Sequence, residues 1–176
     1  LCIPIFTVVA AMIKIDSGGP VFFRHKRCGK GLSEFEMIKF RTMHINSEET
    51  LKRYLEKNPE SLRDLEEKNK IEEDPRVTRI GKLLRRTSID ELPQLLNVLA
   101  GTMSIVGPRP DSREAVEKFY QEYKDIYENI RPGITGLWQV SWRSDVDYKR
   151  RVKLDYLYMF NWSLWLDSVI LLSTFR

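Results

Sequence analysis

Apolar and polar positions follow one another in long blocks along this chain, and the first block is an almost unbroken apolar run that ends at Lys14. Its thirteen residues are too few for a membrane-spanning helix, which needs about 20. The run starts at Leu1 rather than at a methionine, so we expect a chain truncated at both ends. One interpretation is a buried core helix. The other is that residues 1–15 are the second half of a membrane helix that bends at Pro4, since proline removes a helical hydrogen bond.

A β-hairpin is predicted after this helix. Its strands are expected at 21–26 and 35–43, around a turn at 29–31 that contains two glycines. Because side chains alternate along a strand, Lys39 and Arg41 would share one face of the second strand. There they are candidates for a phosphate contact, or equally the solubilising charges of an edge strand.

Two charged helical stretches of opposite character follow the hairpin. Residues 47–74 hold ten acidic and six basic side chains, and we expect a solvated helical insert with Asn46 as its first N-cap and Pro59 opening a second helix. Residues 75–86 are cationic with apolar positions at helical spacing, which predicts an amphipathic helix. Such a helix either lies in a membrane interface or packs on a core with its basic face outward.

The last third of the chain combines turn-forming, basic and aromatic residues. A loop at 131–139 carries Arg131 and Gln139, and a basic run at 148–153 leads into several tyrosines and tryptophans. Tyrosine, tryptophan and basic side chains together are typical of membrane interfaces, although aromatic and basic residues also bind single-stranded nucleic acid. The whole pattern predicts a helix-rich α+β fold with a small antiparallel hairpin, and it leaves open whether the basic and aromatic surface lies on a membrane or binds nucleic acid.

Composition narrows these choices. The 176 residues are expected to form a single domain, because this length suffices to bury one core. The net charge is +4, and since the insert is acidic, the rest of the chain is more basic than this total indicates. A basic body suits anionic lipid, nucleotide or nucleic acid. Two cysteines and two histidines without zinc-type spacing argue against a zinc site, and no Walker, Rossmann or RNA-binding motif is present.

Two adjacent carboxylates, Asp90 and Glu91, stand between the cationic helix and Pro93. Ser88 and Glu91 fit the S-x-x-E capping box of a helix N-terminus, so a purely structural interpretation is open. Pro93 favours the first helical position, which would place both acids in the turn that enters the helix. A helix N-terminus also attracts phosphate and keeps a nearby carboxylate ionised, as a nucleophile or metal ligand must be.

Six motifs, in order, carry a family resemblance over nearly the whole chain. They are SGGPVFFR at 17–24, KFRTM at 39–43, DPRVTRIG at 74–81, TSIDELPQL at 87–95, MSIVGPRP at 103–110 and RPGITGLWQV at 131–140. By these motifs the chain resembles the catalytic domain of the bacterial sugar transferases, the monotopic phosphoglycosyl transferases.

The resemblance implies a reaction. Such enzymes transfer a sugar-1-phosphate from a UDP-sugar to a polyprenyl phosphate such as undecaprenyl phosphate, release UMP, use Mg²⁺ and initiate assembly of a surface glycan. By position, Asp90 would be the nucleophile that becomes linked to the phosphosugar, and Glu91 would hold the metal with it or orient it. A carboxylate is a competent covalent nucleophile, and Mg²⁺ is usually held by one or two carboxylates and substrate phosphate.

Basic side chains would neutralise the substrate phosphates in this scheme. Arg109 can bind a phosphate through its bidentate guanidinium, with prolines on both sides to fix its backbone. Weaker candidates for the same task are Arg85, Arg86, Lys39, Arg41 and Arg131. Gln139 and Arg143 belong to the loop expected to face the nucleotide sugar.

The resemblance also implies a location. The apolar N-terminal segment of the family is described as a re-entrant helix bent at a proline, so residues 1–15 would be its remainder and Pro4 the bend. The enzyme would sit on the cytoplasmic face of the bacterial inner membrane, in contact with lipid. The insert at 47–74 resembles that of the branch which transfers galactose or glucose phosphate. The oligomeric state is not readable from the sequence.

Three positions depart from the family pattern. Thr102 stands where an aspartate is common, Trp142 replaces a glycine beside Arg143, and Ile3 stands where a serine often precedes the proline. Two other classes stay open, a membrane-surface scaffold with a degenerate site and a nucleic-acid-binding module. We favour the transferase, without a nucleic-acid partner. A glycosidase is disfavoured because neighbouring helical residues point about 100° apart, whereas its carboxylates must face each other across a sugar bond.

Overall fold

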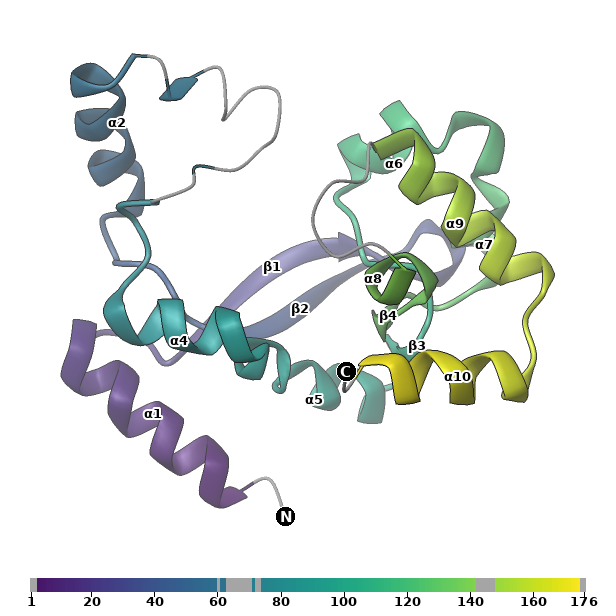
Figure 1. The fold of residues 1–176 in the computed structure, drawn as a ribbon, viewed down its shortest axis with the longest axis horizontal. Coiled ribbons are helices and arrows are strands. Elements are labelled where there is room, and N and C mark those ends of the chain that lie inside the picture. Colours follow the sequence, from purple (N-terminus) through teal and green to yellow (C-terminus); the bar gives the residue numbers. More distant parts are fainter. Residues whose placement is uncertain (1–2, 60, 63–70, 72–73, 142–147, 175–176) are drawn as a thin grey trace. The chain divides into compact units, whose positions relative to one another are not determined.

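The structure, a computed structural model, describes residues 3–59, 61–62, 71, 74–141 and 148–174. It confirms the predicted helix-rich α+β fold with a small antiparallel sheet (Figure 1). Two compact units are present. The first consists of residues 1–23 and 39–92, and the second of residues 24–38 and 93–176.

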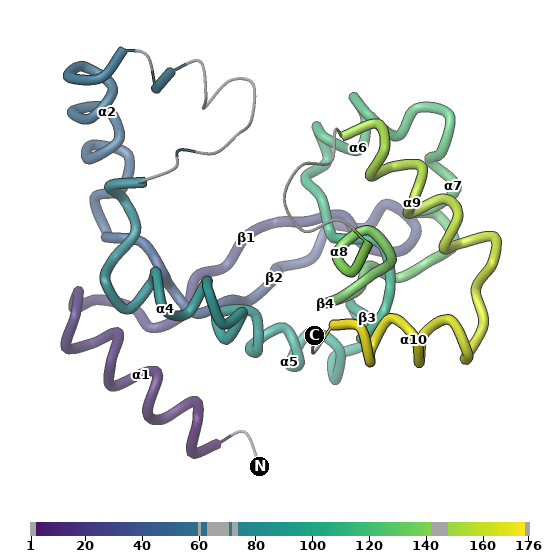
Figure 2. The backbone as a smooth tube through the Cα atoms, in the orientation of Figure 1, coloured from purple at the N-terminus to yellow at the C-terminus, as the bar shows by residue number. Residues whose placement is uncertain are grey.

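The predicted β-hairpin is present, and Figure 2 traces its strands side by side. Strands β1 (Phe22–Cys28) and β2 (Glu34–Phe40) are joined through a 3-10 turn, η1 (Lys30–Leu32). The second strand ends three residues before its predicted limit. Arg41 therefore lies just beyond the strand, whereas Lys39 lies within it.

The first unit is organised by the packing of α1 (Ile3–Ser17) against α4 (Arg79–Thr87). Val9 and Ile13 of α1 are buried with Leu84 of α4. Each such side chain contributes about 1.5–3 kcal/mol when it is fully buried. The apolar N-terminal segment therefore supplies core residues to this unit.

Pro4 lies in the first turn of α1, where a proline costs no helical hydrogen bond. A bend at this position would involve residues before Ile3, so the re-entrant helix stays a prediction. In the part of the chain that the structure describes, no helix is both long enough and apolar enough to cross a membrane.

The beginning of the predicted charged insert is helical. Helix α2 (Ser47–Lys57) has Asn46 at its N-cap position, as predicted, but the Asn46 side chain makes no capping hydrogen bond. The helix expected to open at Pro59 falls largely on residues 60 and 63–70, which lie outside the described residues.

The amphipathic helix predicted over 75–86 is α4, and it begins later than predicted, at Arg79. The Thr78 hydroxyl accepts a hydrogen bond from the Gly81 N–H at 2.9 Å. An N-cap threonine satisfies an otherwise unpaired N–H at a helix start, which explains why the helix begins after Thr78.

The second unit is mostly helical around two paired segments. Its strands β3 (Ser104–Val106) and β4 (Gly133–Thr135) run parallel, with Ser104 opposite Gly133. Its helices are α5 (Gln94–Leu99), α6 (Arg113–Phe119), η3 (Gln121–Tyr123), α7 (Asp125–Asn129), α8 (Leu137–Ser141), α9 (Tyr148–Phe160) and α10 (Leu164–Thr174).

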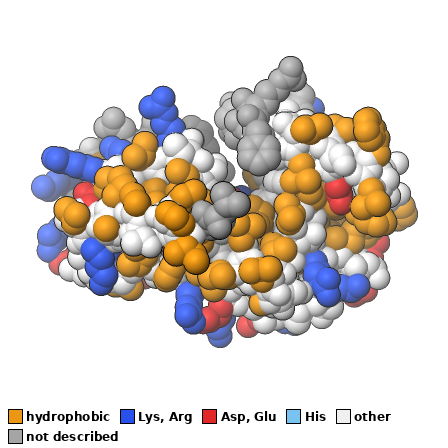
Figure 3. All heavy atoms as spheres, turned by 90° about the horizontal axis from the view of Figure 1, so that it is seen from below, with side chains coloured by type: hydrophobic (Ala, Val, Ile, Leu, Met, Phe, Trp, Pro, Cys, Tyr) orange, Lys and Arg blue, Asp and Glu red, His pale blue; other side chains and the backbone are white. Residues whose placement is uncertain are grey.

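Helix α10 and the turn before it expose large apolar side chains. Trp162, Leu164, Trp165 and Leu172 are between 56% and 78% exposed. Figure 3, which views the molecule from below, shows hydrophobic side chains over α10 on this face. Several exposed tryptophan and leucine side chains on one helix and the turn before it are typical of an interaction site rather than of a surface left in water.

Candidate active site

The carboxylate pair lies in a short 3-10 turn, η2 (Ile89–Glu91), that directly follows α4. Ser88 takes a left-handed conformation with φ 56° and ψ 15°, and its N–H bonds back to the Arg85 carbonyl at 3.3 Å. The capping-box interpretation is wrong, because Ser88 closes α4 and its side chain makes no capping hydrogen bond to η2. Pro93 occupies the N-cap position of α5 rather than its first helical position, and both acids precede that helix.

The strained backbone at Ser88 gives a test of how the turn is built. A non-glycine residue in the left-handed region costs about 1–2 kcal/mol, and a β-branched one costs more. We expect Ser88→Gly to leave the thermal midpoint unchanged or to raise it, and Ser88→Val to lower it by several degrees. Thermal unfolding of both variants measures this. A valine variant as stable as the glycine variant would show that the conformation is not under strain.

Asp90 is buried, with 8% of its surface exposed. Burial raises the pKa of its carboxyl above the ordinary value, and the neighbouring Glu91 raises it further, while Lys39 and Arg85 oppose both effects. Lys39 donates a hydrogen bond from Nζ to Glu91 Oε1 at 2.6 Å. The site therefore holds two carboxylates whose charges are offset by basic side chains from β2 and α4.

The other predicted basic residues of this unit have different surroundings. Arg85 donates from Nε to the Thr42 hydroxyl at 2.9 Å, and Arg86 is exposed. Arg41 is buried and donates to the Ser17 hydroxyl at 2.9 Å and to the Gly18 carbonyl, so it holds the end of α1. Burial lowers the pKa of Arg41. Lys39 and Arg85 are thus the candidates whose charges act on Asp90.

The donor set of this site can be compared with the needs of Mg²⁺. Among the described residues there is no cluster of three or more His, Cys, Asp or Glu side chains that could hold a metal ion. Asp90 and Glu91 supply two carboxylates; burial and then repulsion by Glu91 raise the Asp90 pKa, and a bound cation would relieve the repulsion. Mg²⁺ often binds one or two carboxylates and takes its other ligands from substrate phosphate and water. The pair fits that pattern.

The second unit brings two predicted motifs together. The Gly107 N–H donates to the Thr135 carbonyl at 2.9 Å, and the Gly133 N–H donates to the Pro108 carbonyl at 2.8 Å. A Cβ atom at Gly133 would lie 2.1 Å from the Gly107 nitrogen, so this approach requires glycine. The loop that carries Arg109 therefore lies against the 131–136 segment.

The remaining predicted residues of this unit lie at or just after the 131–136 segment, or outside the described residues. Arg131 is exposed at the start of the 131–136 segment, and Gln139 donates from Nε2 to the Ile134 carbonyl at 3.5 Å. Arg143 lies outside the described residues. Their expected contacts with the nucleotide sugar stay predictions.

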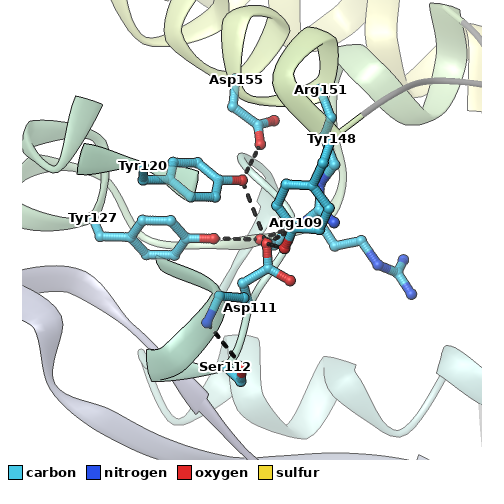
Figure 4. Close-up of polar contacts among 9 residues, drawn as sticks. Arg109, Asp111, Ser112, Tyr120, Tyr127, Tyr148, Arg151 and Asp155 are labelled. Atoms are coloured by element: carbon cyan, nitrogen blue, oxygen red, sulfur yellow. Dashed lines mark hydrogen bonds and ion pairs between the residues drawn. The ribbon is translucent and has the colours of Figure 1, made fainter. Parts of the chain in front are cut away.

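A buried polar cluster, which the sequence analysis missed, surrounds the Arg109 loop (Figure 4). Asp111 Oδ2 accepts hydrogen bonds at 2.6 Å from both Arg151 Nη2 and the Tyr148 hydroxyl. Tyr120 donates from its hydroxyl to Asp155 Oδ2 at 2.9 Å. Positions 148, 151 and 155 follow helical spacing, and this signal could have identified one inward-facing polar stripe within the basic run.

Burial perturbs titration in this cluster. Burial raises the pKa of Asp155 to about 7, although Arg151 and the Tyr120 hydrogen bond lower it. One Asp155 carboxylate oxygen has no hydrogen-bond partner within the described structure. Buried carboxylates with raised pKa values are common at functional sites.

The site holds an acid pair beside basic side chains, an arrangement that suits the handling of a phosphate group. The sequence matches the family described as "Bacterial sugar transferase" over residues 1–176. The chain belongs to this family, as its six motifs predicted.

Curated relatives support the assignment. The chain is 44% identical to "Exopolysaccharide production protein ExoY" of Rhizobium meliloti, over 97% of this chain and 75% of that protein. It is 47% identical to "Undecaprenyl-phosphate galactose phosphotransferase" of Salmonella typhimurium, over 89% of this chain and 33% of that protein. It is 40% identical to "UDP-glucose:undecaprenyl-phosphate glucose-1-phosphate transferase" of Xanthomonas campestris pv. campestris, over 97% of this chain and 34% of that protein. The chain thus spans about a third of the two longer relatives.

Proposed function

We propose that this chain transfers a sugar-1-phosphate from a UDP-sugar to undecaprenyl phosphate or a related polyprenyl phosphate and releases UMP. The observation that carries the proposal is the pair of buried Asp90 and half-buried Glu91 beside Lys39 and Arg85. The names of the Salmonella and Xanthomonas relatives, which match nearly the whole chain, support the same reaction. We further propose that residues 1–176 act as one catalytic domain.

The proposed chemistry has two steps at the sugar-bearing phosphorus. In the first, an Asp90 carboxylate oxygen forms a bond to this phosphorus, the bond to the bridging oxygen breaks, and UMP leaves with that oxygen. In the second, a phosphate oxygen of the polyprenyl phosphate attacks the same phosphorus and displaces the Asp90 carboxylate. The aspartyl-phosphosugar intermediate divides a difficult displacement into two easier ones.

Charge neutralisation accounts for the residues around Asp90. In phosphoryl transfer, positioning and electrostatic stabilisation supply most of the catalysis. Lys39 and Arg85 oppose the negative charge at the pair. Asp90 and Glu91 would hold Mg²⁺, which when bound supplies further neutralisation of the substrate phosphates. Arg109 is the proposed bidentate phosphate contact. Weaker proposals are Arg85, Arg86, Lys39, Arg41, Arg131, Gln139 and Arg143.

The acceptor lipid places the proposed enzyme at a membrane. The apolar α1 segment and the exposed tryptophans and leucines of α10 support contact with lipid. We propose the cytoplasmic face of the bacterial inner membrane, with a re-entrant helix bent at Pro4, because UDP-sugars are made in the cytoplasm. The product would initiate a surface glycan. The names of two relatives favour galactose or glucose as the sugar.

The reaction is tested by UMP release from the full-length protein in detergent. The assay contains Mg²⁺, undecaprenyl phosphate and one of a panel of UDP-sugars, with omission of the lipid and of Mg²⁺ as controls. Multiple-turnover release with one UDP-sugar is expected to depend on both additions and names the donor, whereas without the lipid release should stop at about one UMP per enzyme, because only the first step can occur. Folded protein that releases no UMP with any sugar would overturn the transferase proposal in favour of a membrane-surface scaffold.

The pH dependence of the first step tests the role of Lys39. Asp90 must be ionised to attack, so activity falls as pH drops through its pKa. Lys39 lowers that pKa, so Lys39→Met is expected to raise it and to shift the acidic limb of the rate profile to higher pH. Single-turnover UMP release measured against pH detects the shift. An acidic limb that stays in place would exclude Lys39 from control of the Asp90 charge.

A further inference from the structure

The main-chain carbonyl of Arg109 is contacted by two side chains from different helices, the buried Tyr127 and the largely buried Arg151. The Tyr127 hydroxyl of α7 donates to this oxygen at 2.7 Å, and Arg151 Nη2 of α9 approaches it at 3.4 Å. Pro108 and Pro110 flank the residue, and each proline fixes its own φ. The backbone that orients the Arg109 side chain is therefore constrained on both sides and at its carbonyl.

Both holding residues are themselves immobilised. Tyr127 is fully buried, and its ring packs edge-on against the Tyr120 ring with 5.1 Å between the ring centroids. Arg151 donates to Asp111 Oδ2 at 2.6 Å, and its guanidinium lies 5.0 Å from the ring centroids of Trp138 and Tyr148. A side chain that is already held by its own contacts can fix the position of another group without a further loss of conformational entropy.

The guanidinium of Arg109 has a fixed neighbour as well. It lies 6.0 Å from the centroid of the Trp138 ring, whose other cationic contact is Arg151. A cation over an aromatic face is weakly attracted, by about 0.5–1 kcal/mol where solvent is present. The Arg109 guanidinium therefore contacts an aromatic ring, and the Arg109 carbonyl accepts hydrogen bonds, both from residues of the same unit.

From this geometry we infer that Tyr127 and Arg151 are positioning residues that aim the Arg109 guanidinium at a phosphate of the nucleotide sugar. The inference rests on the proposed function, in which Arg109 binds substrate phosphate. Bidentate phosphate binding depends on the direction of the planar guanidinium, so a small rotation of the loop is enough to weaken it. Neither Tyr127 nor Arg151 needs to touch the substrate.

A double-mutant cycle on kcat/KM for the UDP-sugar tests the inference. Tyr127→Phe removes the hydroxyl and keeps the packed ring, so we expect a three- to tenfold loss, roughly the worth of one hydrogen bond. In an Arg109→Ala background the same substitution should change kcat/KM less than about twofold, because the group it positions is gone. A merely structural role would reduce activity by the same factor in both backgrounds.

Tyr158→Phe is the matched control. Tyr158 is a buried tyrosine of the same unit whose hydroxyl donates to Asp167 at 2.8 Å. Its effect should be equal in both backgrounds. If Tyr127→Phe does not fold, Arg151→Lys enters the same cycle, since lysine keeps a positive charge near Asp111 but loses Nη2, the atom that contacts both Asp111 Oδ2 and the Arg109 carbonyl.

The outcomes separate this inference from the proposed function. Wild-type protein that releases no UMP overturns the proposed function, and the inference with it. Active wild-type protein with equal effects of Tyr127→Phe in both backgrounds, or with no effect in either, overturns the inference alone. Loss confined to the Arg109-containing background supports it.

Discussion

Asp90→Asn is expected to abolish UMP release, with a loss of at least about 10³-fold, because asparagine has the shape of aspartate but cannot form the acyl phosphate. Asp90 is the buried member of the pair, and Lys39 and Arg85 favour its charged form. The variant should also fail to form the covalent phosphosugar adduct. Incubation with UDP-sugar in the absence of acceptor lipid, followed by intact-protein mass spectrometry, detects that adduct.

The control for this prediction is Asp16→Asn in the same unit. The Asp16 carboxylate accepts a hydrogen bond from the Ile80 N–H at 3.1 Å, a contact that asparagine can keep through its carbonyl oxygen. We expect this variant to retain wild-type UMP release. Asp90→Asn protein that is folded, as judged by the same thermal midpoint as the control, and still turns over at a substantial rate would remove Asp90 from its proposed role.

Asp111→Ala is expected to lower the free energy of unfolding by about 3–5 kcal/mol. Asp111 and Arg151 form an ion pair at 2.6 Å in which the side chains are only 12% and 11% exposed. Removal of the carboxylate leaves the Arg151 charge buried, and Tyr148 loses its acceptor. Urea unfolding measures this loss, and thermal unfolding should show a midpoint lowered by roughly 10 °C.

Two further variants show whether the unpaired charge is the cause. Glu117→Ala removes a partner of Arg113 from an exposed ion pair, and it should cost about 0.5 kcal/mol or less. Asp111→Ala combined with Arg151→Met removes both charges and should regain part of the lost stability. If Asp111→Ala costs no more than Glu117→Ala, the buried pair does not stabilise the second unit.

Several helices and strands were predicted well because neighbouring residues in the sequence are enough to specify them. The hairpin has β-forming runs around a glycine turn, and its strands form at β1 and β2 close to the predicted positions. The cationic stretch has apolar residues at helical spacing and forms α4. Its beginning was misplaced because the Thr78 side chain caps the helix at the Gly81 N–H, a contact that hydrophobic periodicity does not show.

In the candidate site, too, features that depend on local sequence were predicted and features that depend on tertiary contacts were missed. Adjacency on the chain is enough to place Asp90 and Glu91 together, and the order of the motifs is enough to identify the family. The left-handed conformation of Ser88, between α4 and the pair, was missed because Ser88 and Glu91 also fit a capping box. The polar cluster around Arg109 was missed because Asp111 comes from a loop, Tyr127 from α7 and Arg151 from α9, which are far apart in the sequence.

By itself, the sequence determined the family, the α+β class and the identity of the candidate carboxylates, since all three depend on residue type and order. Only the tertiary structure decided which side chains are buried together and therefore which charges act on one another. Lys39 reaches Glu91 from 52 positions away, and Arg151 reaches Asp111 from 40 positions away. Such contacts depend on how strands and helices pack, because burial and distance set the strength of an electrostatic interaction.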